Sequence, residues 1–324
     1  MSTSSEEGAP TPEPAPTPPG ERERGTLHAV LAYAVWGLFP VYFKWLQHVA
    51  ALQLVGHRVV WSFVALAGVV LVSRQARALA AFARSPRVLA LYAAAAGLIG
   101  VNWLVFVWAV NNDHVVQTSL GYFITPLVSV LIGVLVLRER LRRWQWAAVL
   151  LAAAGVLQLT ASHGAPLWIA LALALSFGLY GLVKKKAPLA AVPGLTLETA
   201  ILLPPAVAYL LYLEHAGEGA FLRHGALTGA LLIGAGVLTA APLLLFASAA
   251  QRIPLSLIGI LQYIAPSLHL LLGVVFYREP FGVQQLAGFA LVWLALFVFA
   301  ADGMRSRRAS ARGERDEPAS DSGG

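Results

Sequence analysis

The sequence predicts an all-α integral membrane protein with ten transmembrane helices in two inverted five-helix repeats, both termini being cytoplasmic. Three observations support this class. Hydrophobic residues make up 58% of the 324-residue chain and charged residues only 12%, whereas a soluble domain has roughly 45–50% and about 25%. The apolar residues gather in uninterrupted runs of spanning length. One pattern of Pro, Gly and Arg-Glu occurs twice.

The apolar runs predict the individual helices. Each run is uncharged or nearly so and is long enough to cross about 30 Å of hydrocarbon as a helix. Their polarity does not alternate, which excludes the strands of a β-barrel. The predicted spans are residues 27–46, 51–72, 87–109, 115–137, 143–160, 166–183, 195–213, 226–248, 254–277 and 283–301.

The two ends of the chain read as cytoplasmic tails. Residues 1–26 are rich in Pro, Ser and Glu and predict disorder without a cleavable signal, and residues 302–324 predict a second disordered tail. Between them, residues 27–160 form the first predicted repeat and residues 161–301 the second. The chain has no cysteine, so disulfides and thiolate metal sites are excluded; no metal or cofactor is predicted.

The basic residues predict the orientation. All 23 Lys and Arg except Lys44, Arg58, Arg223 and Arg278 lie in segments on the same side as the N-terminus. The positive-inside rule places that side in the cytoplasm. The cations are spread over short segments, so the net charge of +7 reflects orientation and no nucleic-acid partner is predicted. The run Lys184, Lys185 and Lys186 predicts an anchor on anionic lipid head groups.

The internal repeat joins segments 140 residues apart. PLVSVLIGVLVLRER begins at Pro126, and PSLHLLLGVVFYREP begins at Pro266. Upstream, Gly37 aligns with Gly178 at an offset of 141 residues. Because an odd number of predicted helices separates the copies, the second copy enters the membrane from the opposite side. Inverted repeats are a recurrent plan of secondary transporters.

Several motifs resemble the RarD branch of the EamA-type drug/metabolite transporter superfamily: HRVVWSF, NWLVFVWAVNN, SLGYFITPL, KKKA, QYIAPSLHLLLGV and YREP. The resemblance runs over nearly all of the predicted helices. It implies a ten-helix permease of the bacterial inner (plasma) membrane, with two inverted EamA units whose fourth and ninth helices face a central cavity. The branch is described as chloramphenicol-sensitivity permeases.

Ionisable residues inside the predicted spans are the first functional candidates, because an unpaired charge in lipid is costly. Glu198 is the only acidic one, and it fits either a first-turn acid facing the helix dipole or a proton-coupling site. Arg58 fits an anionic solute group or a gate. The neighbouring His57 fits solute contact or a structural hydrogen bond. Arg58 and Glu198 differ in depth, so no direct pair between them is expected in every state.

The repeated prolines, Pro126 and Pro266, predict helix breaks that loosen the helix and either free backbone carbonyls toward a cavity or permit a bend. Tyr122 and Gln262 lie one turn before them, at equivalent positions on the same face. The remaining candidates for solute binding or gating are Asn102, Trp103 and Trp36, with plain packing as the alternative for the tryptophans. The repeated glycines, Gly133 and Gly273, predict close packing, and Glu139 and Glu279 are expected to end helices or pair with adjacent arginines.

The predicted function is a secondary transporter that moves a small organic metabolite or drug-like solute by alternating access, with or without proton coupling. A non-transporting receptor or scaffold is the alternative, although the predicted loops are short. An intramembrane enzyme is less favoured still, because HExxH, GxSxG and phosphate-loop motifs are absent from the sequence. The predicted partners are a small-molecule solute and membrane lipids, and the oligomeric state is left open.

Overall fold

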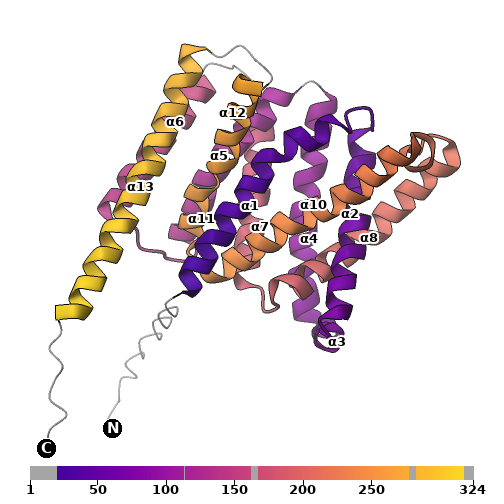
Figure 1. Ribbon diagram of the computed structural model, residues 1–324, viewed down its shortest axis with the longest axis horizontal. Coiled ribbons are helices and arrows are strands. Elements are labelled where there is room, and N and C mark those ends of the chain that lie inside the picture. Colours follow the sequence, from indigo (N-terminus) through magenta and orange to yellow (C-terminus); the bar gives the residue numbers. More distant parts are fainter. Residues whose placement is uncertain (1–19, 113, 162–166, 277–281, 317–324) are drawn as a thin grey trace, which may run out of the picture.

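The computed structural model describes residues 20–112, 114–161, 167–276 and 282–316. All regular elements in these ranges are helices, packed side by side as a bundle (Figure 1). The long helices are α1 (Glu21–Lys44), α2 (Ala51–Val72), α4 (Pro86–Asn111), α5 (Val115–Leu135), α6 (Arg143–Ala161), α7 (Leu167–Lys186), α8 (Ala191–Ala216), α10 (Gly225–Arg252) and α13 (Val283–Asp316). The short ones are α3 (Ala76–Ala83), α9 (Ala220–Arg223), α11 (Leu255–Leu261), α12 (Ile264–Leu271) and the π-helical turn η1 (Leu272–Phe276).

Seven helices of the described ranges are long and apolar enough to cross a membrane: α1, α2, α4, α7, α8, α10 and part of α13. Residues 120–135 of α5 and residues 255–271 of α11 and α12 are shorter apolar helices, and α6 belongs to neither group. The all-helical, multi-pass membrane class is therefore confirmed. The count of ten spans stays a prediction.

The first helix begins earlier than expected. α1 starts at Glu21, within the segment 1–26 that was predicted to be disordered. Glu21 Oε2 accepts a hydrogen bond from Arg252 Nε at 2.7 Å, so the helix start is tied to the end of α10. The disorder prediction was therefore wrong for residues 21–26, because a tertiary ion pair holds a segment whose composition is polar. Residues 1–19 lie outside the described residues.

The last helix continues beyond the predicted end at residue 301. α13 runs to Asp316, so the disorder expected from residue 302 was wrong as far as residue 316. Asp302 is buried and pairs with Arg142 Nη2 at 3.0 Å, just before α6. The stretch beyond Asp302 is rich in Arg, which is a strong helix former. Residues 317–324 lie outside the described residues.

Two short helices were not predicted. α3 joins α2 to α4 and packs on α4 and α8, while α9 joins α8 to α10. They occupy equivalent places in the two halves of the chain. α3 lies at the end of the bundle where α1 begins and α13 ends (Figure 1). Each is too short to register as an apolar run, so sequence periodicity could not reveal them.

Helices of the first half of the chain pack against the equivalent helices of the second half. α2 packs on α8, α5 on α11 and α6 on α13, and in Figure 1 α6 and α13 lie together at one edge of the bundle. An added Cβ at Gly37 of α1 would lie 2.7 Å from Leu268 Cβ on α12, and one at Gly178 of α7 would lie 2.8 Å from Val128 Cγ1 on α5. Leu268 follows Val128 by 140 positions, so the sequence repeat brings equivalent residues into equivalent contacts.

Equivalent helices run in opposite directions. Gln53 near the start of α2 donates from Nε2 to Glu218 O, just after the end of α8, at 2.9 Å. Glu139, which follows α5, accepts a hydrogen bond from Leu255 N at the start of α11. The contacts between α6 and α13 follow the same antiparallel order.

The two repeated prolines have different effects. α5 continues through Pro126, where Thr125 Oγ1 donates to Gly121 O at 2.6 Å. The equivalent segment is interrupted at Gln262 and Tyr263, and Pro266 lies within the first turn of α12. Proline is tolerated in a first turn, where its missing N–H costs little. In the second repeat the helix is interrupted one turn before Pro266, whereas α5 is not interrupted at Pro126, where a loosened helix or a bend stays a prediction.

Replacing Gly259 with Ala is expected to lower the thermal unfolding temperature of the purified protein. The added Cβ would lie 2.6 Å from Pro126 O, a backbone atom that a rotamer change cannot move, and such overpacking costs about 1–3 kcal/mol. Gly97→Ala is the matched control, because nothing lies within 4 Å of its added Cβ. Equal unfolding temperatures for the two variants in detergent would contradict the close approach of α5 and α11.

Candidate functional site

Arg58 of α2 is held by side chains from three other helices. Its Nε donates to Thr239 Oγ1 on α10 at 2.8 Å. The guanidinium carbon lies 4.9 Å from the ring centroid of Trp103 on α4 and 5.4 Å from that of Phe43 on α1. Cation–π contacts of this kind strengthen when water is excluded. A charged group is thus placed between helices of both halves of the chain.

Tyr122 of α5 completes this group. Its ring lies 6.2 Å from Phe106 on α4 and 6.3 Å from His269 on α12, and its hydroxyl interacts electrostatically with Arg58. Tyr122 nevertheless remains 47% exposed. Nearly half of the Tyr122 side chain is therefore left uncovered by protein atoms, although it has neighbours on α2, α4 and α12. We call the following residues the Arg58 cluster: Phe43, Arg58, Trp103, Phe106, Tyr122, Thr239 and His269.

The structure therefore brings together three residues that the sequence singled out, Arg58, Trp103 and Tyr122. Sequence reasoning missed Phe43, Phe106, Thr239 and His269. The usable signal was His269, an ionisable side chain inside an apolar run. Phe43 and Phe106 had no signal, because aromatic residues occur throughout these helices and only the tertiary packing selects the relevant ones.

His57 and Asn102 point away from the cluster. The buried His57 ring stacks on Phe221 of α9, with 5.4 Å between ring centroids. Asn102 Nδ2 donates to Leu173 O and to Ser176 Oγ on α7, each at 2.9 Å. Neighbouring positions on a helix differ by about 100°, which is why His57 and Arg58, or Asn102 and Trp103, face different helices. In this conformation both side chains make structural contacts.

Trp36 and Gln262 are also engaged elsewhere. Trp36 packs against Phe177 and Phe246, with ring centroids 5.8 and 5.9 Å away. Gln262 is buried, and its Oε1 accepts a hydrogen bond from Ser129 Oγ at 3.0 Å. Tyr122 and Gln262 therefore hold equivalent sequence positions but have different surroundings. The helix break at Gln262 directs the Gln262 side chain into the protein interior.

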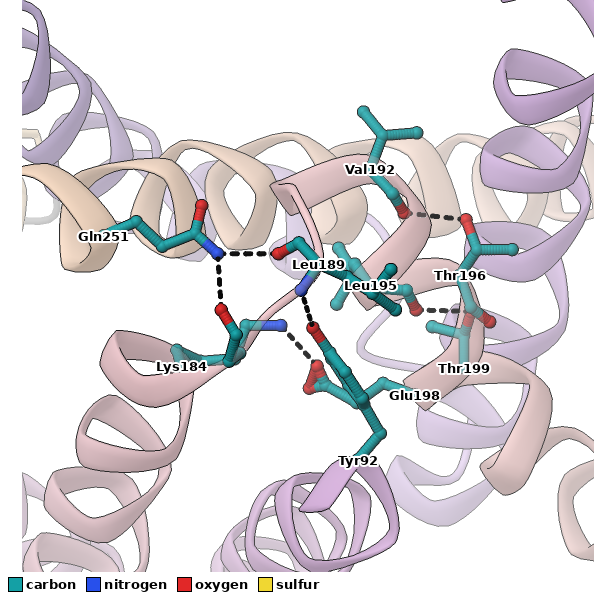
Figure 2. A network of polar contacts seen from close by, with 10 residues as sticks. Tyr92, Lys184, Leu189, Val192, Leu195, Thr196, Glu198, Thr199 and Gln251 are labelled. Carbon is teal, nitrogen blue, oxygen red and sulfur yellow. Dashed lines mark hydrogen bonds and ion pairs between the residues drawn. The ribbon is translucent and has the colours of Figure 1, made fainter. Parts of the chain in front are cut away.

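A second charged site lies at the junction of α7 and α8 (Figure 2). Lys184 Nζ donates to Glu198 Oε2 at 2.6 Å, with both side chains at most 2% exposed. The prediction of a lipid head-group anchor is therefore wrong for Lys184, although Lys186 is exposed. Because α8 begins at Ala191, Glu198 also lies beyond the first turn and does not face the helix dipole as a terminal acid would.

Aromatic rings surround this ion pair. Lys184 Nζ lies 5.5 Å from the ring centroid of Tyr92 and 5.7 Å from that of Tyr180. Leu189 N donates to the Tyr92 hydroxyl at 3.2 Å, which holds α4 against the α7–α8 linker (Figure 2). Glu198 Oε1 and the Tyr180 hydroxyl have no hydrogen-bond partner among the described residues, although the two groups interact electrostatically.

The junction of α10 and α11 is held by Glu139. Its carboxylate accepts hydrogen bonds from Leu255 N at 2.7 Å and Ser256 N at 2.9 Å, which satisfies the free amides at the start of α11. Gly133 leaves room for this carboxylate, since an added Cβ would lie 2.7 Å from Glu139 Oε2. The close packing predicted at Gly133 is found, whereas Glu139 neither ends its helix nor pairs with an arginine. Glu279 lies outside the described residues, and so do the surroundings of Gly273.

The same junction is tied to α7. Lys185 Nζ donates to Ala250 O at 3.3 Å and Ile253 O at 2.7 Å, the exposed carbonyls where α10 ends. Gln251 Nε2 donates to Leu189 O at 2.7 Å (Figure 2). The anchor prediction is therefore wrong for Lys185 as well, because its ammonium group bonds backbone carbonyls of α10 and not lipid head groups.

The sequence pattern of the EamA-like transporter family matches residues 23–161 and again residues 165–301. Protein RarD of Streptomyces exfoliatus is 45% identical over 92% of this chain and 95% of its own length. The chain belongs to the RarD branch of the EamA-like transporter family. RarD of Escherichia coli K12 is 42% identical over 90% of this chain and 99% of its own. An uncharacterized transporter of Bacillus subtilis, YojE, is 44% identical over 90% and 98%.

A solved crystal structure has the same fold, with a TM-score of 0.68 at 20% identity over 88% of this chain and 99% of the other. Membership of the family makes this chain a membrane transporter of the drug/metabolite type. The two matches of the family pattern coincide with the two halves of the chain, whose equivalent helices pack against each other.

Breaking the Lys184–Glu198 pair from one side is expected to destabilise the EamA-type fold. Lys184→Met or Glu198→Leu alone leaves a buried charge without its partner and should cost about 3–5 kcal/mol. The double variant should cost less than either single one. Thermal and denaturant unfolding in mixed micelles measures these differences, with the exposed Arg24→Ala as control. Additive effects of the two single changes would contradict a direct interaction.

Proposed function

We propose that this transporter is a secondary carrier that moves a small organic solute by alternating access. In this proposal the chain crosses the bacterial inner membrane ten times and both termini are cytoplasmic. The two halves, residues 27–160 and 161–301, act as inverted repeats. The small organic solute binds at the Arg58 cluster.

The observation that carries the proposal is the position of Arg58. A charged side chain within a membrane-spanning helix marks a pathway or a binding site unless it is paired inside the protein. Arg58 has no carboxylate partner among the described residues and lies between α1, α2 and α4 of one half and α10 of the other. A movement of one half relative to the other would therefore change the surroundings of the solute.

The helix contacts support alternating access. Equivalent helices are antiparallel and make equivalent contacts, as Gly37 with Leu268 and Gly178 with Val128 illustrate. Two halves related in this way can exchange conformations, and the exchange opens a midplane site first to one side and then to the other. The basic residues assign the end where α1 begins to the cytoplasm.

Proton coupling through Glu198 is the second part of the proposal. The carboxylate is deeply buried, and its charge is offset by Lys184 alone among the described basic residues. Protonation would remove that ion pair and loosen the α7–α8 junction. Glu198 Oε1 has no hydrogen-bond partner among the described residues and would accept the proton.

Cysteine accessibility tests the topology, because the chain has no cysteine of its own. In intact cells, Asn112→Cys and Leu222→Cys are expected to react with a membrane-impermeant maleimide, whereas Arg84→Cys and Arg140→Cys react only after permeabilisation. Each of these positions is exposed. The same reactivity at Asn112→Cys and Arg140→Cys would contradict a crossing by α5.

Flux in reconstituted vesicles tests the carrier function. A metabolite mixture is expected to move across vesicles that contain the protein, and Arg58→Ala should reduce the flux at least about tenfold because it removes the charged contact. Glu198→Gln should abolish the response to a pH gradient. The exposed Arg143→Gln serves as control. Flux equal to that of empty vesicles would contradict the carrier, and an unchanged pH response in Glu198→Gln would contradict coupling at that residue.

A further inference from the structure

Arg58 has hydrogen-bonding capacity that the protein does not use. Its Nε donates to Thr239, but its two Nη atoms have no hydrogen-bond partner among the described residues. Neither Nη atom is one of the fully buried polar atoms without a partner, so both have accessible surface. A guanidinium offers five N–H donors in a fixed fork, and an arginine keeps its charge in proteins. The open side of this fork matches the two oxygens of a carboxylate.

No acidic side chain of the described residues pairs with the guanidinium of Arg58. The described ion pairs use Arg24, Arg142, Lys184 and Arg252, and none includes Arg58. In the described chain the guanidinium contacts Thr239, Phe43 and Trp103, and none of them carries a carboxylate. An uncompensated guanidinium in an apolar span is costly, and a bound anion would offset that cost. A cationic solute would be repelled, and a zwitterion would find no carboxylate for its ammonium group.

The single positive charge of Arg58 matches an anion with one negative charge. A phosphate monoester or a dicarboxylate carries up to two charges, whereas none of the contacts of Arg58 among the described residues is with a Lys or Arg side chain. A single guanidinium matches a monocarboxylate through two parallel hydrogen bonds. The chemistry therefore favours a monocarboxylate over a phosphorylated solute.

The aromatic rings of the cluster define the rest of the solute. Phe43 and Trp103 contact the guanidinium, while Phe106 and the half-exposed Tyr122 extend the aromatic surface along α4 and α5. A flat apolar group attached to the carboxylate would pack on these rings in offset or edge-to-face geometry. The Tyr122 hydroxyl adds a polar group near the carboxylate.

We propose that Arg58 binds the carboxylate of an aromatic monocarboxylate, with Phe43 and Trp103 holding the guanidinium and Tyr122 and Phe106 contacting the ring. Thr239 is a positioning residue, since it orients the guanidinium through Nε. This inference rests on the proposed carrier function and specifies the chemical class of its solute. The contacts of the Arg58 cluster carry it.

The test compares acids with their own amides. Phenylacetate, indole-3-acetate and 4-hydroxybenzoate are each paired with the corresponding carboxamide, and binding to the full chain in lipid nanodiscs is measured by calorimetry. The expected result is that at least one acid binds and that its amide binds at least about tenfold more weakly, as expected for loss of a charge-assisted pair. An amide that binds as well as its acid throughout the panel, or no binding of any acid, overturns the proposal.

Variants separate the charge from the packing. Arg58→Gln is expected to bind the acid at least about tenfold more weakly, whereas Arg58→Lys keeps the charge and retains part of the affinity. Arg143→Gln, an exposed arginine at the start of α6, is the control and should bind like the unchanged protein. Unfolding temperatures confirm that each variant is folded. Equal acid binding by folded Arg58→Gln and Arg143→Gln overturns the proposal.

Vesicle flux distinguishes this inference from the carrier function. Movement of neutral metabolites without movement of any aromatic acid would leave the carrier intact and overturn the inference. Arg58-dependent binding of an acid in nanodiscs without flux of any solute would uphold the binding site and contradict the carrier.

Discussion

A backbone or side-chain polar group within an apolar bundle has no water to bond with, so it must find its partner inside the protein. This constraint organises the molecule. It requires helices, and it requires the free backbone groups at a helix end to find other partners. Glu139 bonds the free amides at the start of α11, and Lys185 bonds the free carbonyls at the end of α10. The junction between these helices is thus held by Lys185 of α7 and by Glu139 from the segment that follows α5.

The two charged sites satisfy the constraint in different ways. Lys184 and Glu198 neutralise each other at 2.6 Å and lie beside tyrosine rings. Arg58 has aromatic rings and one hydroxyl but no acid among the described residues. The charge of the first site is neutralised within the protein, whereas the charge of the second has no such partner. This contrast is why we propose the solute site at Arg58 and the coupling role, which needs a charge that can be removed, at Glu198.

Small residues set the distances at which the halves meet. Gly37 and Gly178 admit Leu268 and Val128, and Gly133 admits the Glu139 carboxylate. Lipid provides no hydrophobic force that brings helices together, so close packing and interhelical hydrogen bonds must hold them. At these points the leucine and valine side chains of one helix fill the space that the glycines of another helix leave open.

The sequence by itself determined the class, the repeat and the family and located the long helices but not all of their ends, because apolar runs, offset motifs and loop charges are properties of the chain alone. It also identified Arg58, Trp103 and Tyr122. The tertiary structure decided which charges meet: Lys184 turned inward to Glu198, Glu139 capped α11, and His57 and Gln262 were used for packing. A helical sequence specifies which residues share a face but not which neighbour that face meets. Partners far apart in the chain therefore emerge only when the helices pack.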